Sequence, residues 1–308
     1  MALRCTLRQL EYLVAVGESG SITGAAQRLN VSPPSVSTAI SQLEAAFGLQ
    51  LFVRKHARGL SLTQGGRQFM DQAQNVLRGA AMLGNLANTI TGQVGGPLHV
   101  GCLLTFAQIV LPKLRRSFET ANPGVAFHQS EQHQAQLIDG LRAARLDVAL
   151  TYDLDIPADL EFLPLVSLPP YAIFAADHPL AGRARITPAE LAPLPLVLLD
   201  LPLSVDYFHA IFAADNLRPN IAERTQDMAV MRSLVANKFG YSIANIRPQS
   251  DVAPDGGLLA SVPIFGSYRP LRMGLVMAEG AENLQNIRSF IAHCRCHLRA
   301  TTPEFEEP

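Results

Sequence analysis

Three permanent cations, Arg54, Lys55 and Arg58, lie within five residues of one another, which is a spacing that could bind an anionic group. The apolar segments 51–53 and 60–62 flank them, and this pattern predicts a β-hairpin that carries the cations at its tip. Guanidinium and ammonium groups form charge-assisted hydrogen bonds with phosphate oxygens. The hairpin is therefore expected to be a wing suited to phosphates. The alternative is a charged loop that only faces solvent.

A second group of reactive residue types lies near the carboxyl end, where His293, Cys294, Cys296 and His297 follow one another closely. On a helix, His293, Cys296 and His297 share one face and could hold a metal ion. The segment is the end of a terminal helix, and a fourth ligand is not evident. We therefore expect neither a metal nor another cofactor. Redox sensing by the cysteine pair has equally little support.

Three short helices are expected to position the hairpin, over residues 7–17, 23–29 and 33–47. Thr6 and Gln9 form a capping-box pattern at the start of the first helix. Ser32 can cap the third helix. Pro33 then occupies its first position, where a missing amide hydrogen costs nothing because that donor has no intrahelical partner. A turn of about three residues joins the second and third helices, which is the helix-turn-helix arrangement. Residues 1–63 are thus predicted to form a winged helix-turn-helix domain.

A long helix is predicted next, because residues 64–91 contain no proline. Phe69, Val76, Leu83 and Ile90 recur every seven residues along it. Such a heptad seam requires a partner helix, so we expect this segment to form a dimer. The alternative is that these side chains pack on their own domain. The glycine-rich residues 92–97 then form a flexible break, which makes 64–96 the predicted linker.

Strands alternate with helices from residue 97 onward, which predicts parallel strands with helices on both faces of a sheet. Expected strands cover residues 98–103, 125–130, 146–152, 171–175, 196–199, 241–244, 258–262 and 271–277, and expected helices cover 106–120, 134–144 and 281–298. This pattern fits one large sheet or two small lobes. Proline-rich stretches near 164–170 and 263–270 resemble two crossings between lobes. They give a first lobe of about 97–165 and 270–300 and a second of about 166–269.

Composition excludes several classes of protein. The 308 residues are 48% hydrophobic and 17% charged, which rules out general disorder and a fibrous repeat. No run reaches the roughly 18 apolar residues of a membrane helix, and four cysteines are too few for a secreted disulfide framework. We therefore expect a cytoplasmic protein. The net charge of −1 conceals +4 over residues 1–90 and −5 over the remainder, which suggests two tasks.

The first 66 residues closely resemble the signature of the LysR-type transcriptional regulator family. Residues 21–37 read SITGAAQRLNVSPPSVS, and residues 48–54 read GLQLFVR. Further along, Leu111-Pro112, Phe118, the sequence NPGV at 122–125 and LDVAL at 146–150 are similar to the effector domain of that family. The resemblance implies a winged helix-turn-helix, a long linker helix and a two-lobed α/β domain of the periplasmic-binding-protein type over 97–308.

The resemblance implies that the third helix enters the major groove of DNA. Short polar side chains in its first half would let the backbone come close to base edges, and with the wing cations they are the expected contacts: Ser32, Pro34, Ser35, Ser37, Thr38, Arg54, Lys55 and Arg58. Ser32 has a competing role as the helix cap. The family usually carries Gln where this chain has Pro33, which cannot read a base by hydrogen bonding, so other residues must do so.

The resemblance also implies a small-molecule effector between the two lobes. Such ligands bind at the carboxyl ends of parallel strands, where helix amides favour anions such as carboxylates. Positions after the predicted strands nominate Leu104, Thr105, Ser130 and Thr151 from the first lobe and Pro202, Ser204 and Gln226 from the second. Each polar residue among them, taken alone, is better explained as a helix cap or a loop hydrogen bond, so only the set is a hypothesis.

The expected function is sequence-specific transcription regulation in which an effector changes DNA binding or bending. Expected partners are duplex DNA, a second copy in a dimer, further copies in a tetramer, and RNA polymerase. An enzyme with an accessory DNA module is the main alternative, but the chain has no nucleophile elbow, Walker loop, dinucleotide fingerprint or zincin motif. A nonspecific architectural DNA protein is disfavoured by the near-neutral total charge.

Overall fold

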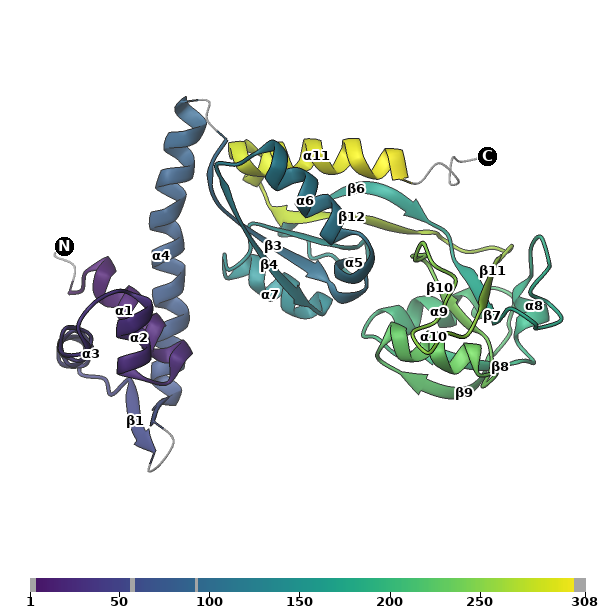
Figure 1. Ribbon diagram of the computed structural model, residues 1–308, viewed down its shortest axis with the longest axis horizontal. Coiled ribbons are helices and arrows are strands. Elements are labelled where there is room, and N and C mark those ends of the chain that lie inside the picture. The colour runs from purple at the N-terminus through teal and green to yellow at the C-terminus, as the bar shows by residue number, and fades with distance from the viewer. Residues whose placement is uncertain (1–3, 56–58, 92–93, 302–308) are drawn as a thin grey trace. The chain divides into compact units, whose positions relative to one another are not determined.

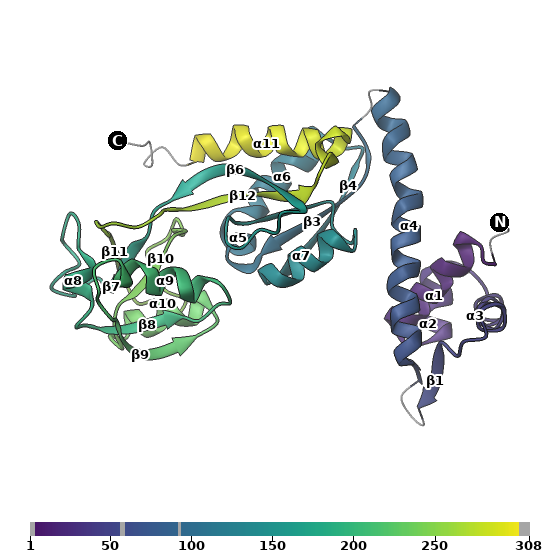
Figure 2. The same cartoon turned by 180° about the vertical axis from the view of Figure 1, so that it is seen from behind.

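The structure of the protein, a computed structural model, describes residues 4–55, 59–91 and 94–301 (Figures 1 and 2). The chain forms two compact units. The first comprises Met1–Pro97 with Arg142–Arg145, and the second comprises Leu98–Leu141 and Leu146–Pro308.

Three short helices form the core of the first unit: α1 (Leu7–Ser19), α2 (Ile22–Arg28) and α3 (Pro33–Phe47). The predicted caps are confirmed. Thr6 and Gln9 form the reciprocal capping box of α1, and the Ser32 hydroxyl accepts the Ser35 amide hydrogen at the start of α3. The helices bury one common apolar cluster, which includes the fully buried Leu13, Val36 and Leu43.

A two-stranded hairpin follows, formed by β1 (Phe52–Lys55) and β2 (Gly59–Leu62) in antiparallel register. The Glu44 carboxylate of α3 accepts the Leu51 and Phe52 amide hydrogens at 2.8 and 3.2 Å, which fixes the strand to that helix. The Leu60 amide donates to the Gly20 carbonyl at 2.8 Å, which fixes β2 to the turn after α1. The expected hairpin is confirmed as far as its strands.

The helix α4 (Gln64–Thr91) is continuous over 28 residues, as predicted. Its first part packs against the first-unit core: Ala73 is buried there, and Phe69 and Leu77 lie against the same cluster. The Phe69 ring meets the Phe47 ring edge-on, with centroids 4.8 Å apart. The amino-terminal half of α4 is therefore part of the helix-turn-helix module.

The second unit contains a five-stranded sheet in the order β4-β3-β5-β12-β6. Its strands are β3 (Gly96–Leu103), β4 (Val125–Gln132), β5 (Val148–Tyr152), β6 (Leu160–Leu168) and β12 (Leu271–Ala278). Strands β3 and β5 are parallel, whereas β12 runs antiparallel to both β5 and β6. The expectation of a parallel sheet is thus wrong for β12, because that strand returns from the other lobe.

Helices cover both faces of this sheet (Figures 1 and 2), as predicted. They are α5 (Leu104–Ile109), α6 (Leu111–Ala121), α7 (Gln134–Arg142) and α11 (Gln285–Thr301). In both views α6 and α11 lie on one face and α7 on the other. This follows from the strand order, because β3-to-β4 and β4-to-β5 connections run in opposite directions and right-handed crossovers then use opposite faces.

A second lobe has its own sheets. Strand β7 (Tyr171–Ala175) pairs antiparallel with β10 (Ser242–Ala244) and β11 (Leu259–Pro263), and β8 (Pro195–Leu199) pairs in parallel with β9 (Asn220–Thr225). Helices α8 (Pro188–Leu191), α9 (Ser204–Ala213) and α10 (Met228–Ala236) complete this lobe. The chain crosses between lobes at residues 169–170 and again over residues 264–270.

Two helix predictions are wrong in detail. The expected helix over 106–120 is two helices, because Pro112 lacks the amide hydrogen that would continue α5 into α6. The expected closing helix over 281–298 begins as a short 3-10 turn (Ala281–Asn283) before α11.

Two strands, β6 and β9, are absent from the prediction. In β6, Pro164 lies opposite Gly274 where the register with β12 shifts, which is a position that tolerates proline.

Two glycine substitutions should change the free energy of unfolding in opposite directions. One lies at the contact between β2 and the α1–α2 turn, and the other lies at an open position of α4. Gly59 has φ +79°, and a Cβ there would lie 2.7 Å from the Gly20 carbonyl oxygen. Gly59→Ala should therefore lower the free energy of unfolding by about 1–3 kcal/mol. Gly79→Ala, in an open position on α4, should raise it by about 0.5–1 kcal/mol. Urea unfolding followed by circular dichroism measures both variants, and shifts in the same direction would contradict the assigned contact.

Candidate nucleic-acid interface and strand-end polar cluster

One side of α3 is exposed and carries short polar side chains. Val36, Ile40 and Leu43 face the core, whereas the predicted DNA contacts Pro34, Ser35, Ser37 and Thr38 are exposed. Ser32 is exposed too, but its hydroxyl caps the helix and lies 2.7 Å from the Ser35 hydroxyl. Ser32 therefore has the helix-capping role that the sequence analysis set against a contact with DNA. Ser37 and Thr38 lie further along the exposed side.

The wing residues are described only in part. The backbone places Arg54 opposite Leu60 and Lys55 opposite Gly59, at the last pairs before the tip of the hairpin. Arg58 lies outside the described residues. The hairpin therefore brings Arg54 and Lys55 to the end of β1, in the same module as α3.

The predicted seam on α4 divides into two parts. Val76, Leu83 and Ile90 are 51%, 68% and 78% exposed, so a stripe of large apolar side chains faces outward at seven-residue spacing. Phe69 differs, because its ring packs against Phe47 within its own domain. The exposed stripe thus consists of Val76, Leu83 and Ile90.

Hydroxyl groups gather at the carboxyl ends of three neighbouring strands of the first lobe. Thr105 is the second residue of α5, directly after β3, and Ser130 lies near the end of β4. Within the described part of the chain, the buried hydroxyl oxygens of both have no hydrogen-bond partner. Thr151, at the end of β5, is fully buried and donates to Gln134 Oε1 at 3.2 Å. Leu104 is half-buried beside Thr105.

An unpaired buried hydroxyl is costly, so two of them at one sheet edge indicate a place where a bound molecule supplies the partner. The α5 backbone begins at the same edge. We call Thr105, Ser130, Thr151 and Gln134 the strand-end cluster.

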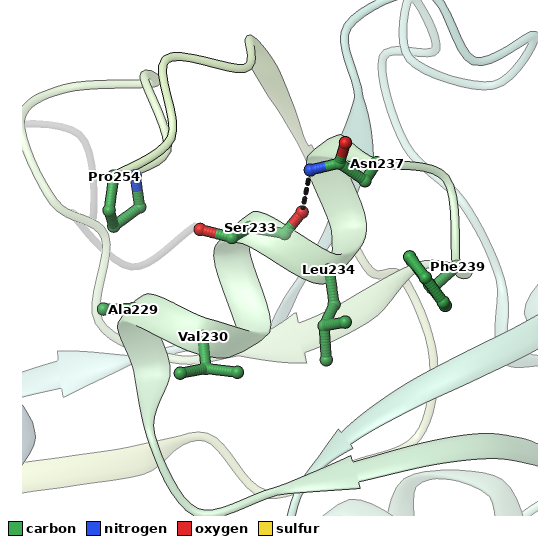
Figure 3. Close-up of a pocket in the computed structure, with 7 residues that line it drawn as sticks. All are labelled: Ala229, Val230, Ser233, Leu234, Asn237, Phe239 and Pro254. Carbon is green, nitrogen blue, oxygen red and sulfur yellow. Dashed lines mark hydrogen bonds between the residues drawn. The ribbon is translucent and has the colours of Figure 1, made fainter.

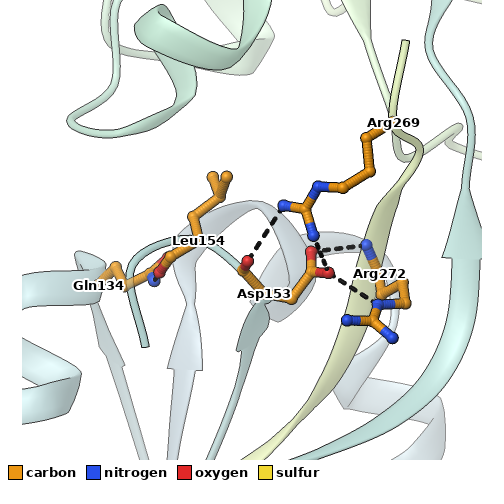
Figure 4. Close-up of polar contacts among 5 residues, drawn as sticks. All are labelled: Gln134, Asp153, Leu154, Arg269 and Arg272. Carbon is orange, nitrogen blue, oxygen red and sulfur yellow. Dashed lines mark hydrogen bonds and ion pairs between the residues drawn. The ribbon is translucent and has the colours of Figure 1, made fainter. Parts of the chain in front are cut away.

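A buried carboxylate that the sequence analysis did not single out completes this edge (Figure 4). Asp153 follows β5, and its side chain is only 4% exposed. The carboxylate accepts from Arg269 at 2.7 Å, from Arg272 Nε at 2.8 Å and from the Arg272 amide at 2.9 Å. Gln134 also donates to the Leu154 carbonyl. The position of Asp153 directly after a predicted strand was a usable signal. Two guanidiniums against one carboxylate leave a local excess of positive charge.

The three positions nominated in the second lobe are separate from these contacts. Pro202 and Gln226 are exposed, and Ser204 is buried at the first position of α9, where its amide donates to the Leu201 carbonyl at 3.1 Å. Leu203, just before it, has φ +70°, a strained backbone conformation for a residue with a side chain. Among the described residues, no hydrogen bond or ion pair joins these three positions to the strand-end cluster.

The histidines and cysteines of α11 are spread over different surroundings. Cys294 is fully buried, and burial raises the pKa of its thiol, whereas Cys296 is exposed. His293 Nε2 lies 2.7 Å from the Ser117 hydroxyl, and burial, with His297 nearby, lowers the pKa of His293. Over the residues that the structure describes, no three side chains of metal-ligand type meet. Nor does any described helix combine the length and apolarity that crossing a membrane requires.

Comparisons with known proteins agree over almost the whole chain. Residues 7–67 match the family described as bacterial regulatory helix-turn-helix protein, lysR family, and residues 91–299 match the LysR substrate binding domain. The transcriptional activator protein LysR of Escherichia coli (strain K12) is 30% identical over 293 residues, which cover 95% of this chain and 93% of that protein.

Solved structures give the same result. HinK, a LysR family transcriptional regulator from Pseudomonas aeruginosa, matches with a TM-score of 0.64 and 32% identity, covering 96% of this chain and 99% of HinK. Full-length CbnR complexed with its target DNA matches with a TM-score of 0.69 over 94% of this chain and 99% of CbnR; at 24% identity this likeness shows the fold alone.

A DNA-binding helix-turn-helix module combined with an effector-binding two-lobed α/β domain defines a class of transcription regulators rather than enzymes. Within that class, this chain belongs to the LysR family.

The unequal bonding of the threonines predicts different effects of removing each hydroxyl. Thr105→Val removes a hydroxyl without a described partner, so the free energy of unfolding should stay unchanged or rise by up to about 1 kcal/mol. Thr151→Val removes the donor to Gln134 and should lower it by about 1–2 kcal/mol. Thermal unfolding compares the two. Equal losses would mean that Thr105 has an internal partner.

Proposed function

We propose that the exposed side of α3 enters the major groove and that the wing contacts the adjacent backbone. The single observation that supports this most is the row of exposed short side chains, Pro34, Ser35, Ser37 and Thr38, on the second helix of a helix-turn-helix. Hydroxyls can bind base edges or phosphates, and Pro34 and the Thr38 methyl suit thymine methyl groups. Ser32 contributes through the cap and a phosphate contact, and Arg54, Lys55 and Arg58 bind phosphates.

The functional division follows the predicted one: a DNA-binding domain over 1–63, a linker helix and hinge over 64–96, and an effector domain over 97–308 with lobes at about 97–165 with 270–300 and at about 166–269. A net charge of +4 on residues 1–90 is modest for a protein that binds duplex DNA. One copy should therefore bind weakly, and two linked copies should bind two half-sites far more tightly.

The stripe on α4 supports a dimer. Val76, Leu83 and Ile90 are large, apolar and exposed at heptad spacing, which is the arrangement of a helix that packs against a second helix. Phe69 contributes by supporting the base of the seam from within its own domain. The protein acts as a homodimer through this helix.

A second apolar surface supports further assembly into a homotetramer. A shallow pocket of about 340 Å³ lies on α10, lined by Val230, Leu234, Phe239 and neighbouring side chains (Figure 3). Val230 and Phe239 are 49% and 51% exposed. Exposed apolar patches of this kind mark contact sites between proteins.

RNA polymerase is a further partner, and the protein works in the cytoplasm, where bacterial DNA is transcribed.

Leu83→Asp tests the dimer and its effect on DNA binding. A charge on the stripe should convert the protein to a monomer in light scattering and weaken binding to a two-half-site fragment by about 100-fold. Leu83→Met keeps the size and apolarity of the side chain and should remain dimeric. In footprinting of both variants, Leu83→Met should protect a defined site on the DNA. A Leu83→Asp protein that is still dimeric would contradict the seam.

The effector proposed for the strand-end cluster is a small carboxylate. Thr105 and Ser130 offer buried hydroxyls without described partners, and Asp153 is already neutralised by Arg269 and Arg272. Thr151 and Leu104 line the same edge. The second lobe supplies Pro202, Ser204 and Gln226 when the lobes close on the ligand. Binding there shifts the lobes and thereby changes DNA binding or bending.

A thermal-shift screen of the full chain against small carboxylates tests this site, with the matching amides as ligand controls. A carboxylate that binds the folded state raises the melting temperature. Thr105→Val should weaken that ligand about tenfold, since a charge-assisted hydrogen bond is lost. Thr120→Val, an exposed threonine on α6, should not. If no carboxylate raises the melting temperature, or if amides bind equally well, the assignment of a carboxylate fails.

A further inference from the structure

A second cavity lies at the junction of the two lobes and shares no residue with the strand-end cluster. It has a volume of about 370 Å³. Its walls come from the end of α5, the first two turns of α6, strands β6 and β12, the last turns of α11, and the segment that follows β10. Pockets for small molecules in proteins begin at about 300 Å³, so this cavity is large enough for one.

The inner walls of the cavity are apolar. Leu114, Leu168, Met273 and Leu298 are each at most 7% exposed, and Val110 and Val166 add half-buried branched side chains. Such a surface binds hydrocarbon or aromatic groups through removal of apolar area from water.

The polar residues that line the cavity are Lys113, Ser117, Arg247, Gln249 and His297, and all except the half-buried Ser117 are exposed. Lys113 and Arg247 are exposed cations that line it, and none of the described residues that line the cavity is acidic. The Lys113 ammonium donates to Gln249 Oε1 at 2.8 Å, a neutral partner that leaves its charge uncompensated in this contact. Arg247 pairs with Asp251 at 3.0 Å, outside the lining. The cavity therefore combines an apolar interior with a cationic rim.

We propose that this cavity binds an amphipathic anion, a molecule with a hydrocarbon or aromatic body and one carboxylate head. The body occupies the space between Leu114, Leu168 and Met273. The carboxylate replaces Gln249 as the partner of Lys113, because an ammonium binds a carboxylate more strongly than it binds a neutral amide.

The ligand would contact both lobes at once. Lys113 and Leu114 belong to α6 in the first lobe, whereas Ile246, Arg247 and Gln249 follow β10 of the second. A molecule that exchanges the Lys113–Gln249 contact for its own contacts therefore favours one arrangement of the lobes over another. The cavity is a second regulatory site, beyond the effector site proposed at the strand ends.

Isothermal titration of the full chain with octanoate tests the proposal, with octan-1-ol and octyltrimethylammonium as matched probes. Octanoate should bind at least about tenfold more tightly than either, since only it offers an anion to the rim. Lys113→Glu should abolish measurable octanoate binding. Arg116→Glu makes the same charge change at an exposed position of the same helix outside the cavity and should leave the affinity within about twofold.

A filled cavity provides a variant that does not depend on charge. Val166→Phe places a larger side chain in the cavity, and it should prevent octanoate binding while circular dichroism shows a native spectrum. If Val166→Phe misfolds, Lys113→Glu against Arg116→Glu decides the question alone. Equal binding of octanoate and octyltrimethylammonium, or equal losses in Lys113→Glu and Arg116→Glu, would overturn the proposal.

Two further measurements separate this cavity from the other proposals. Thr105→Val should leave octanoate affinity unchanged, so failure of the strand-end effector site and failure of this site are distinguishable. Light scattering should give the same mass with and without octanoate. A fall in mass on adding octanoate would mean that a second copy of the chain occupies the cavity, and that outcome would overturn the proposal.

Discussion

The attachment of β12 to the end of β5 is the constraint on which the second unit depends. The Asp153 amide donates to the Arg272 carbonyl at 3.1 Å, and the Arg272 amide donates back to the Asp153 carboxylate at 2.9 Å. The guanidiniums of Arg272 and Arg269 bind the same carboxylate. Because the Asp153 side chain is only 4% exposed, its charge requires these partners. Arg269 lies on the segment that returns from the second lobe, so one carboxylate fixes the point of return.

Two members of the strand-end cluster, Thr151 and Gln134, adjoin Asp153. Thr151 lies two positions before Asp153 and donates to Gln134, which in turn donates to the carbonyl of Leu154, one position after it. One member of the cluster, Thr151, and the carboxylate that anchors the crossing therefore lie within the same four residues, 151–154. The effector that we propose at this edge would bind directly beside the segment that connects the lobes. No long relay of contacts is required for such a coupling.

Local patterns predicted the first unit well, because its helices depend on caps and spacing within a few residues. Ser32 with Pro33 fixes the start of α3, and the seven-residue repeat indicates α4. Contacts between residues far apart in the sequence could not be predicted from local patterns. Asp153 and Arg269 are separated by 116 residues, and nothing near either one indicates the pair. Phe69 follows the heptad spacing, yet its partner is Phe47 on another helix of the same domain. Strand β6 is not predicted by the sequence analysis, because Pro164 is unusual inside a strand. The register shift opposite β12 explains why proline is tolerated there.

The hydrogen bonds between the lobes differ in how readily another partner can replace one of their groups. Asn245, which follows β10 in the second lobe and is buried, donates to the Leu168 carbonyl of β6 at 2.9 Å. Within the second lobe it also donates to the Tyr207 hydroxyl at 3.1 Å, and burial raises the pKa of Tyr207 to about 12, so this phenol stays neutral. Breaking such buried bonds would leave polar groups unpaired, which is costly. The Lys113–Gln249 contact is exposed, and water or an anion can replace either partner at little cost. If the lobes rearrange, the buried bond at β6 is therefore the more costly one to break, and the exposed Lys113–Gln249 contact is the easier one to exchange. The exchangeable contact thus lies at the rim of the cavity rather than at the crossing itself.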